Sequence, residues 1–354
     1  MRIDFNVKHF DYEKRIGNLA KEAVGKVKSE KHFPIFNENG KEVIFKPLSK
    51  TKPLSTPLFA YSEVVWSHII KTYFDEKTPL YHLAVCEKIE ELNPKYYHHG
   101  TVVESIVNKN EDLVNLLEYY LANPHESVDI ASYINYCEKL YDYSFFFETP
   151  IFQDNKEICE KFALQILLSL LKADQNFHYE NIIFKTVGCK ITQLASSIDH
   201  EFSTMFLYAD DPNRHNVLYN RFLEKFKIKS GNSVENQIFN LFNKNSAPIK
   251  NLNAVVKHQP DVAAKFLKQL QRMLADLKRE KIILQNKGYM TPFNSNNYEI
   301  GELQYKENDE LAAKAKMKQL NQYTLNLGIF SNRVNEEIIE TGKTLERAIR
   351  HRLR

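Results

Sequence analysis

Four residues of this 354-residue chain, Lys46, Glu63, Asn181 and Asp199, have the types and the order needed to handle phosphate charge. Lys46 closes the strand-like segment "KEVIFKPL", and Glu63 lies in the middle of the helical segment that follows. A strand lysine can reach nucleotide phosphates while a helix carboxylate holds it in place. Asn181 and Asp199 supply oxygens of the kind that Mg²⁺ prefers. The pattern therefore indicates nucleotide and metal chemistry.

Each of these residues also has an ordinary structural interpretation. A lysine at a strand end is most often solvated, and a helix glutamate more often still. Asn181 alone would be a turn former, and Asp199 a loop carboxylate. The functional interpretation gains weight because the four residues occur in the required order, on elements of the required type.

A polar loop, "ADQNFHYENIIF" (173–184), follows an apolar helical segment and leads directly into a strand. It contains Asp174, Asn176 and His178, which are candidate catalytic residues for the transfer of a phosphoryl group. Histidine is readily satisfied inside a protein, so His178 is interpreted first as an organiser of the loop.

Hydrophobic periodicity predicts the elements that must position these residues. Strand signals lie at 41–48, "LYHLAVCEK", "GTVVESIV", "NIIFKTV" and "CKITQLASSI", the last two joined at Gly188. Helical periods occupy 55–74, most of 110–171, and the chain after 211, including a long amphipathic helix over 260–284. The prediction is an α+β protein with a small β-rich lobe carrying one helix, then a larger helical lobe with a two-stranded insert.

We expect an N-terminal lobe over 1–106, a helical lobe over 107–305 and a helical extension over 306–354. The lobes would be connected near 102–106, where backbone groups around Glu104 can meet an adenine ring.

Composition bounds the remaining function classes. A net charge of +3 gives no field strong enough to indicate nucleic acid, and no apolar run is long enough to span a membrane. Four scattered cysteines suggest neither a disulfide framework nor a zinc knuckle, and the histidine pair in "YYHHG" has no third ligand at metal spacing. These features favour a cytoplasmic protein, or an effector secreted without a cleaved signal. The basic end "KTLERAIRHRLR" is interpreted as a solvated helix end.

The motifs "VIFKP", "YSEVVWSHII", "FHYENIIF" and "SSIDHEFS" resemble those of the HipA-like serine/threonine kinases, closest in type to the CtkA-like proinflammatory kinases. The resemblance spans roughly residues 20–210. It implies a two-lobed protein-kinase-like fold and an ATP- and Mg²⁺-dependent kinase acting on a protein substrate. Lys46 would then bind the phosphates, Glu63 would orient it, and Asn181 and Asp199 would hold metal.

The chain departs from the family pattern at two places. The Gly- and Ser-rich phosphate loop has its counterpart at 25–31, where Gly25 and Ser29 stand among lysines, and the resemblance implies self-phosphorylation at Ser29. At the position of the catalytic Asp stands Asn176, and the nearest acid is Asp174. An active kinase using Asp174 as its base, a pseudokinase acting as a nucleotide-regulated binding protein, and a structural helical adaptor all stay open.

Overall fold

The computed structural model describes residues 2–4, 7–20, 32–49, 57–106, 110–123, 142–172, 177, 179–188, 190–196, 247–279, 283–285, 335 and 339. The chain divides into two compact units. Unit 1 consists of 1–110, 198–203 and 280–318, and unit 2 of 111–197, 204–279 and 319–354. The lobe boundaries predicted from the sequence stay predictions.

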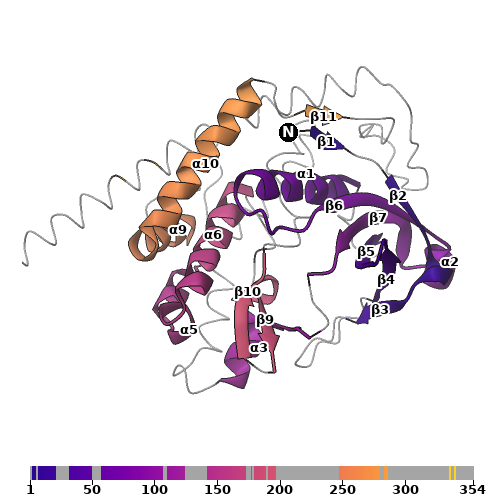
Figure 1. Cartoon of the computed structure of the whole chain (residues 1–354), viewed down its shortest axis with the longest axis horizontal. Helices are drawn as coiled ribbons and strands as arrows, with labels where there is room; N and C mark the ends of the chain where they lie inside the picture. The colour runs from indigo at the N-terminus through magenta and orange to yellow at the C-terminus, as the bar shows by residue number, and fades with distance from the viewer. Residues whose placement is uncertain are drawn as a thin grey trace, which may run out of the picture. The chain divides into compact units, whose positions relative to one another are not determined.

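Unit 1 is built on a six-stranded sheet of order β2-β6-β7-β5-β4-β3 (Figure 1). Its strands are β2 (Val7–Asp11), β3 (Gly17–Ala20), β4 (His32–Glu38), β5 (Lys41–Ser49), β6 (Tyr81–Glu87) and β7 (Tyr96–Glu104). All neighbours are antiparallel except β2 and β6, which are parallel. The strand predicted at 41–48 and the two β-rich segments after the helix are confirmed.

One helix, α1 (Pro57–Tyr73), packs against β6 and β7. Its buried residues include Val64, Trp66 and Ile70, so the helical period predicted for 55–74 is confirmed. The opposite face of the sheet carries a separate apolar cluster, made by Phe36, Val43, Phe45, Ala84, Cys86, Ile89 and Val102. A short helix, α2 (Ile89–Leu92), lies between β6 and β7 in the chain, and a 3-10 turn, Tyr12–Lys14, follows β2.

Unit 1 also contains a parallel two-stranded pairing of β1 (Arg2–Asp4) with β11 (Ile283–Gln285). This corrects the helix predicted over 260–284, because α10 (Pro260–Lys278) ends before the β-branched Ile282 and Ile283. A strand partner at the other end of the chain outweighs the helical period there, and local spacing does not reveal such a partner.

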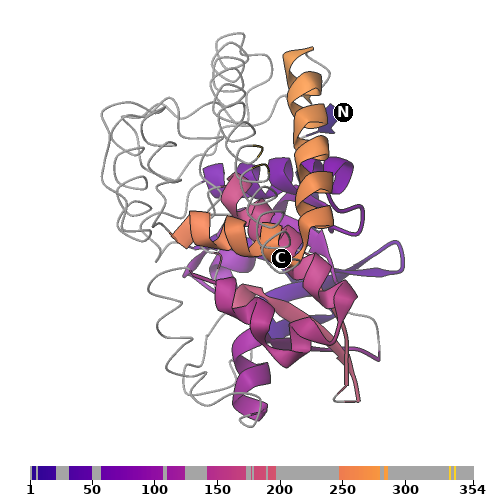
Figure 2. The same ribbon diagram turned by 90° about the vertical axis from the view of Figure 1, so that its left-hand side faces the viewer.

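Unit 2 is organised around α6 (Lys156–Lys172), which contacts α5 (Pro150–Gln153), α9 (Ala247–His258) and α10. Figure 2 shows α9 and α10 running in different directions, with Pro260 as the first residue of α10. The core is aromatic, with Phe152 and Phe162 stacked at 4.3 Å between ring centroids. In the described part of the chain, no helix combines the length and the apolar character needed to cross a bilayer.

A three-stranded sheet of order β10-β9-β8 completes unit 2, from β8 (Asp112–Asn115), β9 (Ile183–Val187) and β10 (Lys190–Leu194). The two predicted strands and their turn at Gly188, which has φ 53°, are confirmed. The helical prediction for the residues after Asn110 is wrong at β8. Asn115 there forms a capping box with Glu118, so α3 (Leu116–Ala122) starts only at Leu116 and the preceding residues pair with β9.

Candidate functional site

Lys46 and Glu63 form an ion pair in unit 1, with 2.6 Å between Lys46 Nζ and Glu63 Oε1. Alternation along β5 explains the direction of the lysine: Phe45 is buried in the apolar cluster of one face, so Lys46 stands on the other face, toward α1. The side chain of Glu63 is 3% exposed and that of Lys46 18% exposed. A carboxylate so deeply buried needs charge-assisted partners.

The second oxygen of Glu63 has a partner that sequence analysis missed. Thr101 Oγ1 donates to Glu63 Oε2 at 2.5 Å, and Thr101 is 1% exposed. Thr101 lies on β7 directly opposite Lys46 on β5. Lys46, Glu63 and Thr101, called here the Lys46 triad, therefore come from three different elements and leave neither carboxylate oxygen of Glu63 without a donor.

Gly100 makes the close approach of β7 to β5 possible. A Cβ built on Gly100 would lie 2.1 Å from the backbone oxygen of Lys46, a clash with main chain that no rotamer change can relieve. Any larger residue would push β7 away and move Thr101 from Lys46. A glycine inside a strand pattern often marks such an approach, so the "HHGTVV" segment carried a usable signal.

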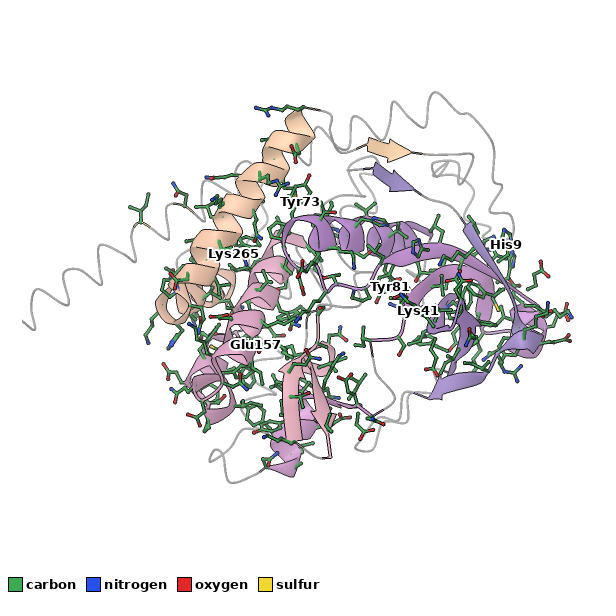
Figure 3. All side chains as sticks on the ribbon, viewed as in Figure 1. His9, Lys41, Tyr73, Tyr81, Glu157 and Lys265 are labelled. Atoms are coloured by element: carbon green, nitrogen blue, oxygen red, sulfur yellow. The ribbon has the colours of Figure 1, made fainter. Side chains whose placement is uncertain are left out.

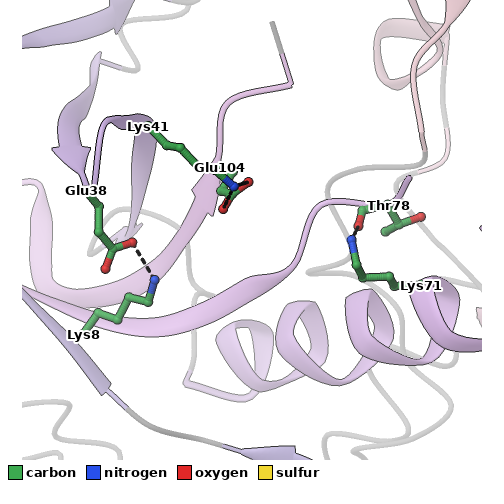
Figure 4. Close-up of polar contacts among 6 residues, drawn as sticks. All are labelled: Lys8, Glu38, Lys41, Lys71, Thr78 and Glu104. Atoms are coloured by element: carbon green, nitrogen blue, oxygen red, sulfur yellow. Dashed lines mark hydrogen bonds and ion pairs between the residues drawn. The ribbon is translucent and has the colours of Figure 1, made fainter. Parts of the chain in front are cut away.

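Other predicted nucleotide-binding residues of unit 1 are placed only in part. Gly25 and Ser29 lie outside the described residues, but the ends of their segment are neighbours, because Ala20 pairs with His32 across β3 and β4. Glu104 is exposed and its carboxylate binds Lys41 Nζ at 2.9 and 3.1 Å (Figure 4). The N–H of Ser105 donates to the carbonyl of Glu42, so that donor is already engaged.

A second group of polar residues in the six-stranded sheet comes from β2, β4, β5 and β6. Lys8 binds Glu38 at 2.6 Å, as Figure 4 also shows, and Lys41 appears on the same sheet in Figure 3. Burial, together with the charge of Lys8, lowers the pKa of His82 below its ordinary value. These residues are not part of the Lys46 triad.

In unit 2, Asn181 ends a 3-10 turn, Tyr179–Asn181, two positions before β9 begins at Ile183. Asn181 is buried, and the carbonyl of the next residue, Ile182, accepts from Leu116 N at 2.9 Å. Its predicted companions Asp174, Asn176, His178 and Asp199 lie outside the described residues. Their roles, like that of Asn181, stay predictions.

Three side chains of unit 2 bind residues that lie close in sequence to those positions: two bind backbone carbonyls, and one binds a side-chain hydroxyl. Tyr143 Oη donates to the carbonyl of Phe177 at 2.6 Å. Gln165 Nε2 donates to the carbonyl of Ala195 at 2.7 Å, and Lys161 Nζ donates to Ser196 Oγ at 3.1 Å. Tyr143, Gln165 and Lys161 are called here the loop anchors. Sequence analysis missed them because nothing in their local spacing indicates a distant backbone carbonyl as partner.

No three His, Cys, Asp or Glu side chains of the described residues are grouped so that they could hold a metal ion. The predicted partner of Asn181 in a Mg²⁺ site, Asp199, lies outside the described residues. The carboxamide oxygen of Asn181 is of a type that suits Mg²⁺.

Comparisons with known proteins show similarity at the level of solved structures alone. No protein-family model matches the sequence. No curated protein matches it either. Among solved structures, the chain is similar to the crystal structure of the proinflammatory kinase CtkA from Helicobacter pylori. The superposition covers 93% of this chain and 98% of that one, with a TM-score of 0.46 and 12% sequence identity. At these values, function has to be inferred from the side chains themselves.

Proposed function

We propose that this protein is an ATP- and Mg²⁺-dependent protein serine/threonine kinase of the HipA-like type. The observation that carries the proposal is the Lys46 triad. A lysine on a central strand, paired with a glutamate of the next helix, is the arrangement with which protein kinases hold nucleotide phosphates. The Lys46 side chain, 18% exposed, carries a charge that matches phosphate; Glu63 holds it, and Thr101 in turn binds Glu63.

The strand order of unit 1 supports the same function. Strands β3 and β4 are antiparallel neighbours, and β4 pairs with the lysine strand β5. In the order of elements, their connection, residues 21–31, corresponds to the loop with which kinases cover the nucleotide phosphates. Gly25 and Ser29, with Lys26, Lys28 and Lys31, would contact phosphate there. Backbone groups near Glu104 would contact the adenine ring.

The proposed reaction transfers the γ-phosphoryl group to a hydroxyl of a protein. The hydroxyl oxygen bonds to the γ-phosphorus, the bond from that phosphorus to the β–γ bridging oxygen breaks, and ADP leaves with that electron pair. The hydroxyl proton passes to the carboxylate of Asp174. Bound Mg²⁺ would neutralise charge on the phosphates, and Asn181 and Asp199 would hold it. Lys46 contributes a fixed positive charge to the same phosphates.

One sequence feature favours a second candidate, a pseudokinase that binds nucleotide and acts through a partner. Asn176 stands where the family pattern has its catalytic Asp, and an amide cannot accept the proton. Phosphoryl transfer depends mainly on positioning and charge stabilisation, so a site without a general base is slow but not necessarily inert. Transfer of phosphate therefore separates the two candidates.

The test is incubation of the protein with γ-labelled ATP and Mg²⁺, followed by mass spectrometry of the protein itself. We expect label on the wild type, with phosphate at Ser29 because neighbouring lysines would pair with phosphoserine. Lys46→Ala and Asp199→Asn should each abolish most of the label. Nucleotide binding without transfer would identify the pseudokinase, and no nucleotide binding would refute both candidates.

A further inference from the structure

A hydrogen-bond relay in unit 2 runs from α9 to the polar loop that precedes β9. Asn251 of α9 accepts from the backbone N–H of Tyr143 at 2.7 Å. The hydroxyl of Tyr143 then donates to the carbonyl of Phe177 at 2.6 Å. Two side chains thus connect a helix late in the chain with a loop that begins directly after α6.

Each member of the relay is shielded from water. Tyr143 is 2% exposed, Asn251 3% and Phe177 7%. The ring of Tyr143 also meets the ring of Phe177 edge to face, with 5.0 Å between centroids. A hydrogen bond in such surroundings competes with little solvent, and losing its donor leaves a buried carbonyl unsatisfied. The backbone at Phe177 is therefore held more firmly than loop backbone usually is.

A second support holds Tyr143 itself in place. Asp142 is buried; its Oδ1 accepts from Ser144 N at 3.1 Å and from Ser144 Oγ at 2.5 Å. Lys250, which precedes Asn251 in α9, lies 3.4 Å from the other oxygen of Asp142. Asp142 and Tyr143 thus both contact α9, through Lys250 and Asn251 respectively. Tyr143 cannot shift without breaking these contacts.

The held carbonyl lies in the segment with the proposed transfer residues. Phe177 directly follows Asn176 and comes three residues after Asp174. Transfer requires a base placed within hydrogen-bond distance of the hydroxyl, and errors near 1 Å can reduce a rate about a hundredfold. We propose that Tyr143 is a positioning residue for phosphoryl transfer, which it supports by holding the Phe177 carbonyl. This inference rests on the proposed kinase function.

The substitution Tyr143→Phe removes only the hydroxyl and keeps the ring. Tyr120→Phe is a matched control: Tyr120 is 3% exposed, belongs to the same unit, and its hydroxyl bonds Thr149 Oγ1 at 2.7 Å, a partner that is not part of the polar loop at 173–184. Both variants lose one buried hydroxyl that forms a hydrogen bond, so a general loss of stability should affect them similarly.

The first measurement is hydrogen exchange by mass spectrometry over the peptide spanning 173–182. We expect faster exchange in Tyr143→Phe, by about fivefold for a lost bond of roughly 1 kcal/mol, and wild-type exchange in Tyr120→Phe. Equal exchange in the two variants would overturn the positioning role. This measurement does not depend on catalysis, so it decides the role even if the wild type transfers no phosphate and the kinase function fails.

The second measurement is the rate of phosphate transfer at varied ATP concentration. Tyr143→Phe should lower kcat by about tenfold to a hundredfold while KM for ATP stays at the wild-type value, because the Lys46 triad is untouched. If Tyr143 had only a structural role, kcat would fall by the same factor in Tyr143→Phe and in Tyr120→Phe. A Tyr143→Phe enzyme with kcat no lower than that of Tyr120→Phe would contradict the proposal.

Discussion

The Lys46 triad of unit 1 and the loop anchors of unit 2 use opposite means to position functional groups. The triad holds a charge directly. The ammonium of Lys46 binds one oxygen of the buried Glu63 carboxylate, and the hydroxyl of Thr101 binds the other. The loop anchors act on the backbone or on a neutral hydroxyl, through Phe177, Ala195 and Ser196. In the Lys46 triad, the ammonium proposed to act on phosphate is itself bound by a residue of the packed interior of unit 1.

This difference predicts different responses to substitution. Breaking a buried ion pair leaves an uncompensated charge and lowers both stability and function. Removing an anchor whose partner is neutral costs about one hydrogen bond and changes mainly the position of a segment. Substitutions in the triad should therefore raise KM for ATP or abolish binding, whereas substitutions in the anchors should lower kcat.

The largest effect is expected from Lys46→Ala. Phosphate transfer should fall by at least about a hundredfold, because a fixed positive charge is lost at the transferring group. The free energy of unfolding should fall by up to about 3 kcal/mol, since Glu63 remains buried without its cation. Transfer assays and urea unfolding measure the two effects.

The double variant Lys46→Ala with Glu63→Gln separates them. It removes both charges and keeps an acceptor for Thr101, so stability should return toward wild type while transfer stays lost. Recovery of activity together with stability would show that Lys46 has only a structural role.

The next effect concerns the base. Asp174→Asn should reduce kcat by about a hundredfold to ten-thousandfold, the usual contribution of a general base, while Asn176→Asp should change it little. Single-turnover transfer with saturating ATP measures both. A protein that is silent as wild type and becomes active as Asn176→Asp would be a natural pseudokinase.

A smaller effect is expected from Thr101→Val, which keeps the shape of the side chain and removes the donor to Glu63. Loss of a charge-assisted bond of about 1.5 kcal/mol should raise KM for ATP by roughly tenfold. Thr78→Val is the matched control, because Thr78 is 0% exposed and its hydroxyl has no hydrogen-bond partner among the described residues. Equal KM values for the two variants would remove Thr101 from the site.

The smallest effect is a dependence of stability on pH. Burial, and then the charge of His98, lower the pKa of His99 from 6.5 to about 4. Between these values the unfolded chain binds more protons than the folded one, so stability falls as pH is lowered from 6.5 to 4. In His99→Gln, the loss of unfolding free energy between pH 6.5 and pH 4 should be smaller than in the wild type by on the order of 1 kcal/mol, as measured by thermal unfolding at each pH. An unchanged slope would show that His99 does not contribute.

Comparison of prediction and structure separates local from distant causes. The strand at 41–48 and the helix at 55–74 were predictable because their apolar residues repeat at strand and helix periods. The same method failed at β8, where four residues with a helical appearance pair with β9, and at β11, which pairs with the first residues of the chain. In both failures a distant strand outweighed the local pattern.

By itself, the sequence determined the alternation that points Lys46 away from the apolar cluster and the helical segment that carries Glu63. These depend on residues only a few positions apart, where steric and periodic rules apply directly. Only the tertiary structure decided that Thr101 completes the triad, that Gly100 permits it, and that Tyr143 holds the carbonyl of Phe177. The two hydrogen bonds join residues that are 34 and 38 positions apart in the sequence, and Gly100 lets strands β7 and β5 approach each other. Such distant pairings are set by the packing of the whole unit and not by local sequence.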